Sequence, residues 1–332
     1  MKQFIYIVAA GNQAIEVWKL LYTGEMHLIQ IVYTENNEGQ PIIISKKRNT
    51  LYIGIRPKYK ILVYNILSNG TLKKTGSVNI PYSPNYITLD QKEKFLLCSY
   101  YHAGCLTIST INDQHIPEQP IQIIKNMNGC HAVKLDLSNK LVITTSLLTD
   151  RIYLFKLHLF GKLPLKYLKY VICSKKSGPR HIIFHNSKNY CYSINELNGT
   201  VDVWKINNVN NNIQNIQNIS LFKQKIKNNY FWSADIHMTS CSKYLYVSDR
   251  LYSTITIFKI NLNCTLNFIH QINTVKQPKS FIINSNNNYL IVASQTCNTI
   301  AVYSISMKNG LLNLLYKYPT GINPTWIISH TI

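Results

Sequence analysis

Seven short segments repeat one pattern along the chain, and the first of them reads IEVWKL at residues 15–20. Apolar and polar residues alternate in each copy, and β-branched and aromatic side chains dominate, which indicates a half-buried strand. The other copies are ILVYNI (61–66), LTISTI (106–111), IYLFKL (152–157), VDVWKI (201–206), ITIFKI (255–260) and IAVYSI (300–305). Because the copies recur at roughly 45 residues, a period typical of propeller blades, the sequence predicts seven blades.

Each repeat has room for four strands. A turn, often with proline, precedes a short apolar strand, and a second strand, the repeated segment and a looser fourth strand follow. Helical periodicity is nearly absent, so we expect an all-β, seven-bladed β-propeller with four antiparallel strands per blade. The Trp-Asp dipeptide of WD40 repeats is missing. We expect a single domain over 1–332, since all-β folds of this length often form one unit.

The two ends of the chain complement each other. The chain starts at FIYIV (4–8), which matches a second strand, and it ends with PTWIIS (324–329), which matches an innermost strand without successors. Joined, the two ends complete one blade. We therefore expect the N- and C-terminal strands to share a blade and close the ring, which leaves no open sheet edge at the seam.

The composition restricts the compartment and the cofactors. No run approaches the ~20 apolar residues of a membrane helix, and we interpret residues 4–10 as a strand rather than a signal peptide. The eight cysteines form no C-x-x-C pair and show no paired metal-ligand spacing. We therefore expect a cytoplasmic protein with no membrane association, no cofactor and no metal, and we expect a monomer.

The formal net charge of +21 raises the question of nucleic-acid binding. The lysines are scattered singly or in pairs and form no basic block, and the excess of Lys, Asn, Ile and Tyr follows A/T-rich codons. We therefore expect no nucleic-acid partner. A positive field nevertheless raises the local concentration of an anionic small-molecule substrate.

Propeller topology brings polar residues from distant repeats to one rim. The start of each first strand and the end of each second strand lie at the same mouth of the central channel. Only 14 residues of the chain are acidic, yet Glu196 and Asp235 both fall there. Strand ends are often polar, but turns elsewhere in this chain carry Asn, Ser and Lys, so we interpret the rim as a site. Its predicted residues are Arg56, Asn85, Tyr101, His102, His131, Arg180, His181, Glu196, Asp235, Arg250, Lys279, Gln295 and Trp326.

This rim suits acid–base chemistry on an anionic ester. Hydrolysis of a lactone needs a base that activates water and donors that stabilise the oxyanion. His131 and Glu196 are the candidate bases, and a nearby carboxylate would orient the histidine. The arginines Arg56, Arg180 and Arg250 can bind a phosphate or carboxylate in a bidentate manner. Two carboxylates among several cations disfavour a divalent metal ion.

Segments along the whole chain resemble the seven-bladed lactonase family and, within it, the bacterial 6-phosphogluconolactonase branch. The most specific are GPRH (178–181), NELN (195–198) and WSADIH (232–237), and GIRP (54–57), YHAG (101–104), GCH (129–131) and PTW (324–326) also match. In the carboxymuconate cyclase branch of the family, a histidine, an arginine and a glutamate are assigned to the site. They correspond here to His131, Arg180 and Glu196. Lys279 departs from the pattern, where arginine is expected, as does His102, where asparagine is expected.

The resemblance implies metal-independent hydrolysis of a phosphorylated sugar lactone, 6-phospho-D-glucono-1,5-lactone, in the oxidative pentose phosphate pathway. In this hypothesis His131, supported by Glu196, activates water, and Arg180 stabilises the carbonyl oxygen. The expected substrate-binding residues are Arg56, Tyr101, His181, Asp235, Arg250, Lys279 and Gln295. Two alternatives stay open: a carboxymuconate-type lactonising cyclase of the same fold, and a non-catalytic propeller that binds a protein partner.

Overall fold

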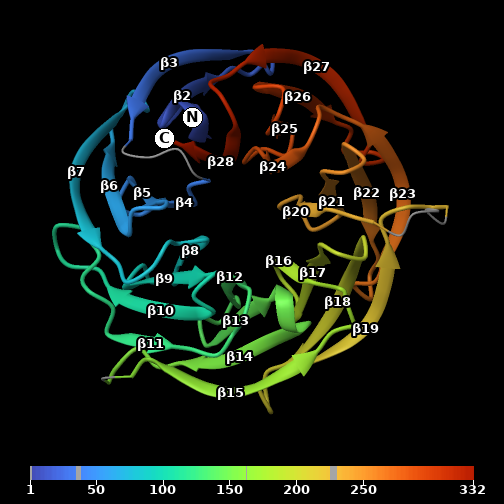
Figure 1. Cartoon of the computed structure of the whole chain (residues 1–332). Coiled ribbons are helices and arrows are strands. Elements are labelled where there is room, and N and C mark those ends of the chain that lie inside the picture. Colours follow the sequence, from blue (N-terminus) through green and yellow to red (C-terminus); the bar gives the residue numbers. More distant parts are fainter. Residues whose placement is uncertain (1, 35–38, 162, 225–229) are drawn as a thin grey trace.

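The seven repeated segments are the third strands of seven four-stranded sheets arranged in a ring (Figure 1). The computed structural model describes residues 2–34, 39–161, 163–224 and 230–332. All strand pairs within the sheets are antiparallel, so the predicted seven-bladed propeller is confirmed. No helix within the described ranges is long and apolar enough to cross a membrane.

The strands are ordered from the channel outward in each blade. The first blade consists of β28 (Pro324–Thr331), β1 (Gln3–Ala9), β2 (Ala14–Leu20) and β3 (Met26–Tyr33), and the second of β4 (Ile42–Ser45), β5 (Thr50–Ile55), β6 (Lys60–Ile66) and β7 (Leu72–Asn79). The third consists of β8 (Tyr86–Leu89), β9 (Phe95–Tyr100), β10 (Cys105–Thr110) and β11 (Gln122–Ile124). The fourth consists of β12 (Cys130–Leu135), β13 (Leu141–Ser146), β14 (Arg151–Leu157) and β15 (Leu165–Ile172).

Three further blades complete the ring. They are β16 (Pro179–Phe184), β17 (Tyr190–Asn195), β18 (Thr200–Asn207) and β19 (Asn212–Ser220); β20 (Ser233–Met238), β21 (Tyr244–Asp249), β22 (Thr254–Ile260) and β23 (Leu266–Asn273); and β24 (Pro278–Ile283), β25 (Tyr289–Ser294), β26 (Thr299–Ile305) and β27 (Leu312–Pro319). Two short 3₁₀ turns, η1 (Ala10–Asn12) and η2 (Leu147–Thr149), follow β1 and β13.

The ring closes as the two ends of the sequence predict. Strand β28 is the innermost strand of the blade whose other three strands begin the chain, and it pairs with β1 over the register from Gln3↔Thr331 to Ala9↔Pro324. The two termini therefore lie beside each other in the first blade (Figure 1). This pairing, which is irregular only at Val8/Ala9, joins the first and last repeats by strand pairing rather than by side-chain packing alone.

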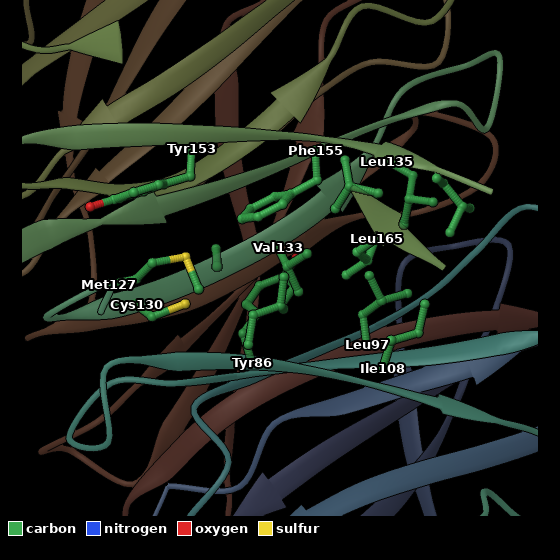
Figure 2. Packing of buried hydrophobic residues seen from close by; sticks show 14 of the residues in the cluster. Tyr86, Leu97, Ile108, Met127, Cys130, Val133, Leu135, Tyr153, Phe155 and Leu165 are labelled. Atoms are coloured by element: carbon green, nitrogen blue, oxygen red, sulfur yellow. The ribbon is translucent and has the colours of Figure 1, made fainter. Parts of the chain in front are cut away.

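Apolar residues from neighbouring blades pack face to face. Figure 2 shows one such cluster, in which Tyr86, Leu97 and Ile108 of the β8–β11 blade meet Val133 and Phe155 of the next blade. These side chains are all buried, and burying each contributes about 1.5–3 kcal/mol relative to exposure. The inner and middle strands are consequently buried on both faces, and charged residues on them stand out.

Candidate active site

A cavity of about 190 Å³ lies at the centre of the ring, and all seven blades contribute to its wall. Most of the wall comes from first-strand starts and second-strand ends, as the rim geometry predicts. The lining residues are Gly39, Arg56, Asn85, Tyr101, His131, Leu147, Arg180, Glu196, Arg250, Lys279, Thr325 and Trp326. His131, Arg180 and Glu196 therefore face one shared pocket, although they are far apart in the sequence.

Irregular pairing at the first-strand starts redirects three of these side chains. The register between the first two strands shifts at Cys130/Val133, Pro179/Ile182, Ser233/Ile236 and Pro278/Ser280. His131, Arg180 and Lys279 lie within these β-bulges. A bulge locally disrupts the ladder and redirects side chains, and bulges are common beside active sites.

Glu196 lies between two guanidinium groups. Its Oε2 is 2.8 Å from Nε of Arg180 and 3.0 Å from Nη2 of Arg250. In the described part of the chain no ion pair or hydrogen bond joins Glu196 to His131, which differs from the expected support of the histidine. The physical reason is that two adjacent cations attract the carboxylate more strongly than a neutral imidazole does.

The loop that precedes Arg180 is held in place by the carboxylate of Asp150. Asp150 accepts hydrogen bonds from the backbone N–H groups of Lys176 and Gly178, at 2.6 and 2.8 Å. The carbonyl of Gly178 in turn accepts from the backbone N–H of Glu196. These bonds hold the backbone at Glu196, and the two guanidinium groups hold its carboxylate.

Positive charge dominates the pocket. The side chain of Arg250 lies over the ring of Trp232, with its Cζ 3.9 Å from the ring centroid, and its Nε donates to the Trp232 carbonyl. Burial and the neighbouring Arg180 lower the pKa of Arg250 to about 9. Burial, Arg180, Arg250 and Arg56 lower the pKa of Lys279 to about 7.

Arg56 completes the cationic side of the wall. Its Nε donates to Ser83 Oγ at 3.2 Å, and its Nη1 donates to the Gly39 carbonyl at 3.4 Å. A Cβ atom on Gly39 would lie 3.1 Å from Nζ of Lys279, so the glycine leaves room for the lysine head group. Arg56 and Lys279 therefore meet at the Gly39 side of the pocket.

His131 is a buried, neutral imidazole in the same wall. Burial, followed by the nearby cations Arg180 and Arg250, lowers its pKa well below the usual value. Among the described residues, its Nδ1 is buried without a hydrogen-bond partner. Its ring makes edge contacts with Tyr101 and His181, with centroids at 6.0 and 5.1 Å. The imidazole is therefore neutral and has a lone pair that can accept a proton, although burial and the neighbouring cations weaken it as a base.

Three predicted substrate-binding residues do not line this pocket. His181 and Asp235 lie in a smaller cavity of about 100 Å³, lined also by Tyr86, Lys134 and His237. Gln295 belongs to neither cavity wall, and its Oε1 is buried without a hydrogen-bond partner within the described ranges. The sequence places all three at strand ends correctly, but strand-end position alone does not determine where a side chain points.

Some wall residues carry no signal in the sequence. Gly39, Leu147 and Thr325 were not predicted, because small or apolar residues at turns are common throughout the chain. His237, which also was not predicted as a site residue, lies 3.3 Å from the Asp235 carboxylate. Within the residues that the structure describes, no group of three or more His, Cys, Asp or Glu side chains could hold a metal ion.

Together, the fold and the pocket define a seven-bladed β-propeller with a central, strongly cationic site beside a neutral histidine. The chain belongs to the family described as "Lactonase, 7-bladed beta-propeller", whose family model matches residues 5–329. It is 48% identical to a 6-phosphogluconolactonase of Buchnera aphidicola over the full length of both chains. It is 34% identical to that of Erwinia tasmaniensis over 99% of this chain and 98% of the relative.

Solved structures agree on the fold. The periplasmic gluconolactonase PpgL of Pseudomonas aeruginosa superimposes with a TM-score of 0.91 at 16% identity, over 99% of each chain. A Lactobacillus plantarum protein superimposes equally well, with a TM-score of 0.91 at 18% identity over the whole of both chains. At such low identity these similarities support the fold alone, and the substrate has to be inferred from the residues of the pocket.

Proposed function

We propose that the protein hydrolyses 6-phospho-D-glucono-1,5-lactone to 6-phospho-D-gluconate in the oxidative pentose phosphate pathway. The observation that carries this proposal is the composition of the pocket, in which Arg56, Arg180, Arg250 and Lys279 surround a single carboxylate beside neutral His131. Relatives named 6-phosphogluconolactonase, at 33–48% identity over nearly the full chain, support the same assignment.

The phosphate group of the substrate suits the Gly39 side of the pocket. A phosphate monoester carries about −1.5 to −2 charges at pH 7, and guanidinium groups bind it with charge-assisted hydrogen bonds. Arg56 and Lys279 meet there beside Gly39, whereas Arg180 and Arg250 lie against Glu196. Arg56 and Lys279 therefore hold the phosphate, and Arg250 assists from the far side.

The lactone carbonyl then lies toward Arg180 and His131. His131 takes a proton from a water molecule, whose oxygen attacks the carbonyl carbon C1. Negative charge develops on the carbonyl oxygen, and the Arg180 guanidinium stabilises it. The bond from C1 to the ring oxygen breaks, and the ring oxygen takes the proton from His131. One water is consumed, and the carboxylic acid formed ionises to the carboxylate of the product.

The proposal extends to the setting of the enzyme. All eight cysteines are free thiols, and six of them are buried, which supports a reducing compartment, the cytoplasm. We further infer one functional domain over 1–332 that acts as a monomer on a small-molecule substrate, with no nucleic-acid or membrane partner. No cofactor takes part in the proposed steps.

The experiment is a hydrolysis assay by NMR on the phosphorylated lactone, with the spontaneous rate subtracted. We expect turnover of this lactone, less of unphosphorylated glucono-1,5-lactone, and no ring closure of a carboxylated muconate. His131→Ala should lower kcat by about 10²–10⁴-fold if the histidine is the base, whereas exposed His27→Ala on an outer strand should leave kcat unchanged. Binding without turnover by the wild-type protein would instead support a binding module, and ring closure would support the cyclase.

A further inference from the structure

Asp235 is a buried carboxylate that the proposed reaction does not use. It lies in the small cavity next to the pocket, with which that cavity shares Trp326, and the residue is 6% exposed. Both oxygens are surrounded by donors within hydrogen-bond distance. Around Oδ1 lie His181 Nδ1 at 2.8 Å and the Ile236 N–H at 3.0 Å. Around Oδ2 lie Ser280 Oγ at 3.1 Å, the Phe281 N–H at 3.3 Å and His237 Nε2 at 3.3 Å.

This environment fixes the tautomer of His181. Burial raises the pKa of Asp235, but His237 and His181 outweigh that effect and hold the pKa well below its usual value. An ionised carboxylate only accepts hydrogen bonds, so Nδ1 of His181 carries the hydrogen in their contact. Burial and Arg180 lower the pKa of His181 to about 4, so its ring is neutral at pH 7 and its Nε2 is an acceptor.

The acceptor Nε2 faces the pocket arginine. It lies 3.1 Å from Nη1 of Arg180, and the same Nη1 also donates to the carbonyl of Ala234. Nε of Arg180 is paired with Glu196. The guanidinium is thus held by hydrogen bonds to His181 and Ala234 and by an ion pair with Glu196. The β-bulge that contains Arg180 and His181 lets these sequence neighbours occupy two cavities and still touch.

We propose that His181 and Asp235 form a positioning pair that holds the Arg180 guanidinium in place for the developing oxyanion, and that neither residue binds substrate. The kinetic part of this inference rests on the proposed function. Without Asp235, the neutral ring could carry its hydrogen on Nε2, and two donors would then face each other. Arg180 would turn away from the position that the reaction needs.

Two substitutions of His181 distinguish a role in positioning Arg180 from a general role in folding. His181→Leu removes the acceptor, and we expect kcat to fall by about 10–100-fold, because a displacement of a catalytic group by about 1 Å can cost 10²-fold. KM should change little, since the phosphate is held on the Gly39 side. His181→Gln places a carbonyl oxygen close to the position of Nε2 and should restore kcat. Ser280→Ala, which removes a different donor to Asp235, is the matched control and should leave kcat within about twofold.

The tautomer itself can be measured in the wild-type protein without any substrate. In ¹⁵N NMR of the histidine rings, we expect His181 to show a protonated Nδ1 and an unprotonated Nε2 at pH 7. In Asp235→Asn the Nε2–H form should become populated, and kcat should fall with it. A wild-type His181 protonated on Nε2, or a His181→Leu variant with normal kcat, would overturn the positioning pair. Absence of lactone turnover in the wild-type protein with the expected tautomer would instead contradict the proposed function alone.

Discussion

Glu196 and Asp235 are both carboxylates near the ring axis, yet their surroundings differ. The side chain of Glu196 is 15% exposed and meets two guanidinium groups at the wall of the larger cavity, whereas that of Asp235 is 8% exposed and surrounded by donors in the smaller one. Glu196 therefore sets the charge that a substrate meets. Asp235 has no such access, and its effect reaches the substrate only through His181 and Arg180.

The comparison predicts its largest effect at Glu196. In Glu196→Gln, Arg180 and Arg250 lose the charge that separates them, so both guanidinium groups repel each other and shift. We expect kcat/KM for the phosphorylated lactone to fall by about 10²–10³-fold, the range found when an oxyanion donor is lost. Steady-state kinetics with circular dichroism as a folding control would measure it. A folded variant with kcat/KM within threefold of wild type would show that Glu196 is no more than a wall residue.

Substitution of Arg56 tests which of the two cavities binds the phosphate group of the substrate. Arg56→Ala should lower kcat/KM for the phosphorylated lactone by about 10–150-fold, since a charge-assisted hydrogen bond contributes about 1.5–3 kcal/mol. Turnover of unphosphorylated lactone should stay unchanged. Lys134→Met, which removes a cation from the smaller cavity, is the control and should alter neither rate. Equal losses on both lactones in Arg56→Ala would place the phosphate elsewhere.

Lys279 gives the pocket a pH dependence. Its pKa is lowered to about 7, so the amine is charged below that pH and becomes neutral above it. Attraction for the phosphate weakens on deprotonation, and KM should rise by about 3–10-fold between pH 6 and pH 8.5, because the neutral amine still donates a hydrogen bond and only the charge assistance is lost. In Lys279→Arg the guanidinium stays charged and the rise should disappear. The same rise in both proteins would assign the titration to another group.

The sequence predicts the ring and the rim well, and it predicts the contacts within the rim less well. Strand alternation and a regular period are local properties, so the seven third strands and the shared terminal blade were predicted correctly. A β-bulge depends on the register between two strands, which no residue pattern reveals. The bulge at Pro179/Ile182 sends Arg180 to the pocket and His181 to the cavity next to it. Likewise, the partner of Glu196 depends on side-chain distances, and these favour arginine over His131.

The smallest effect is expected away from both cavities, where a residue serves the fold alone. The buried hydroxyl of Tyr246 donates to the carbonyl of Gly310 in the next blade at 2.9 Å, and Tyr6 and Tyr192 make equivalent contacts with Gly70 and Cys264. Tyr246→Phe keeps the ring packed and removes only the donor, so the free energy of unfolding should fall by about 1–2 kcal/mol. Chemical denaturation would measure this loss, and kcat/KM should stay at the wild-type value. A kinetic defect in this folded variant would mean that the pocket senses blade-to-blade packing, and the separation between site and scaffold argued from Glu196 and Asp235 would then fail.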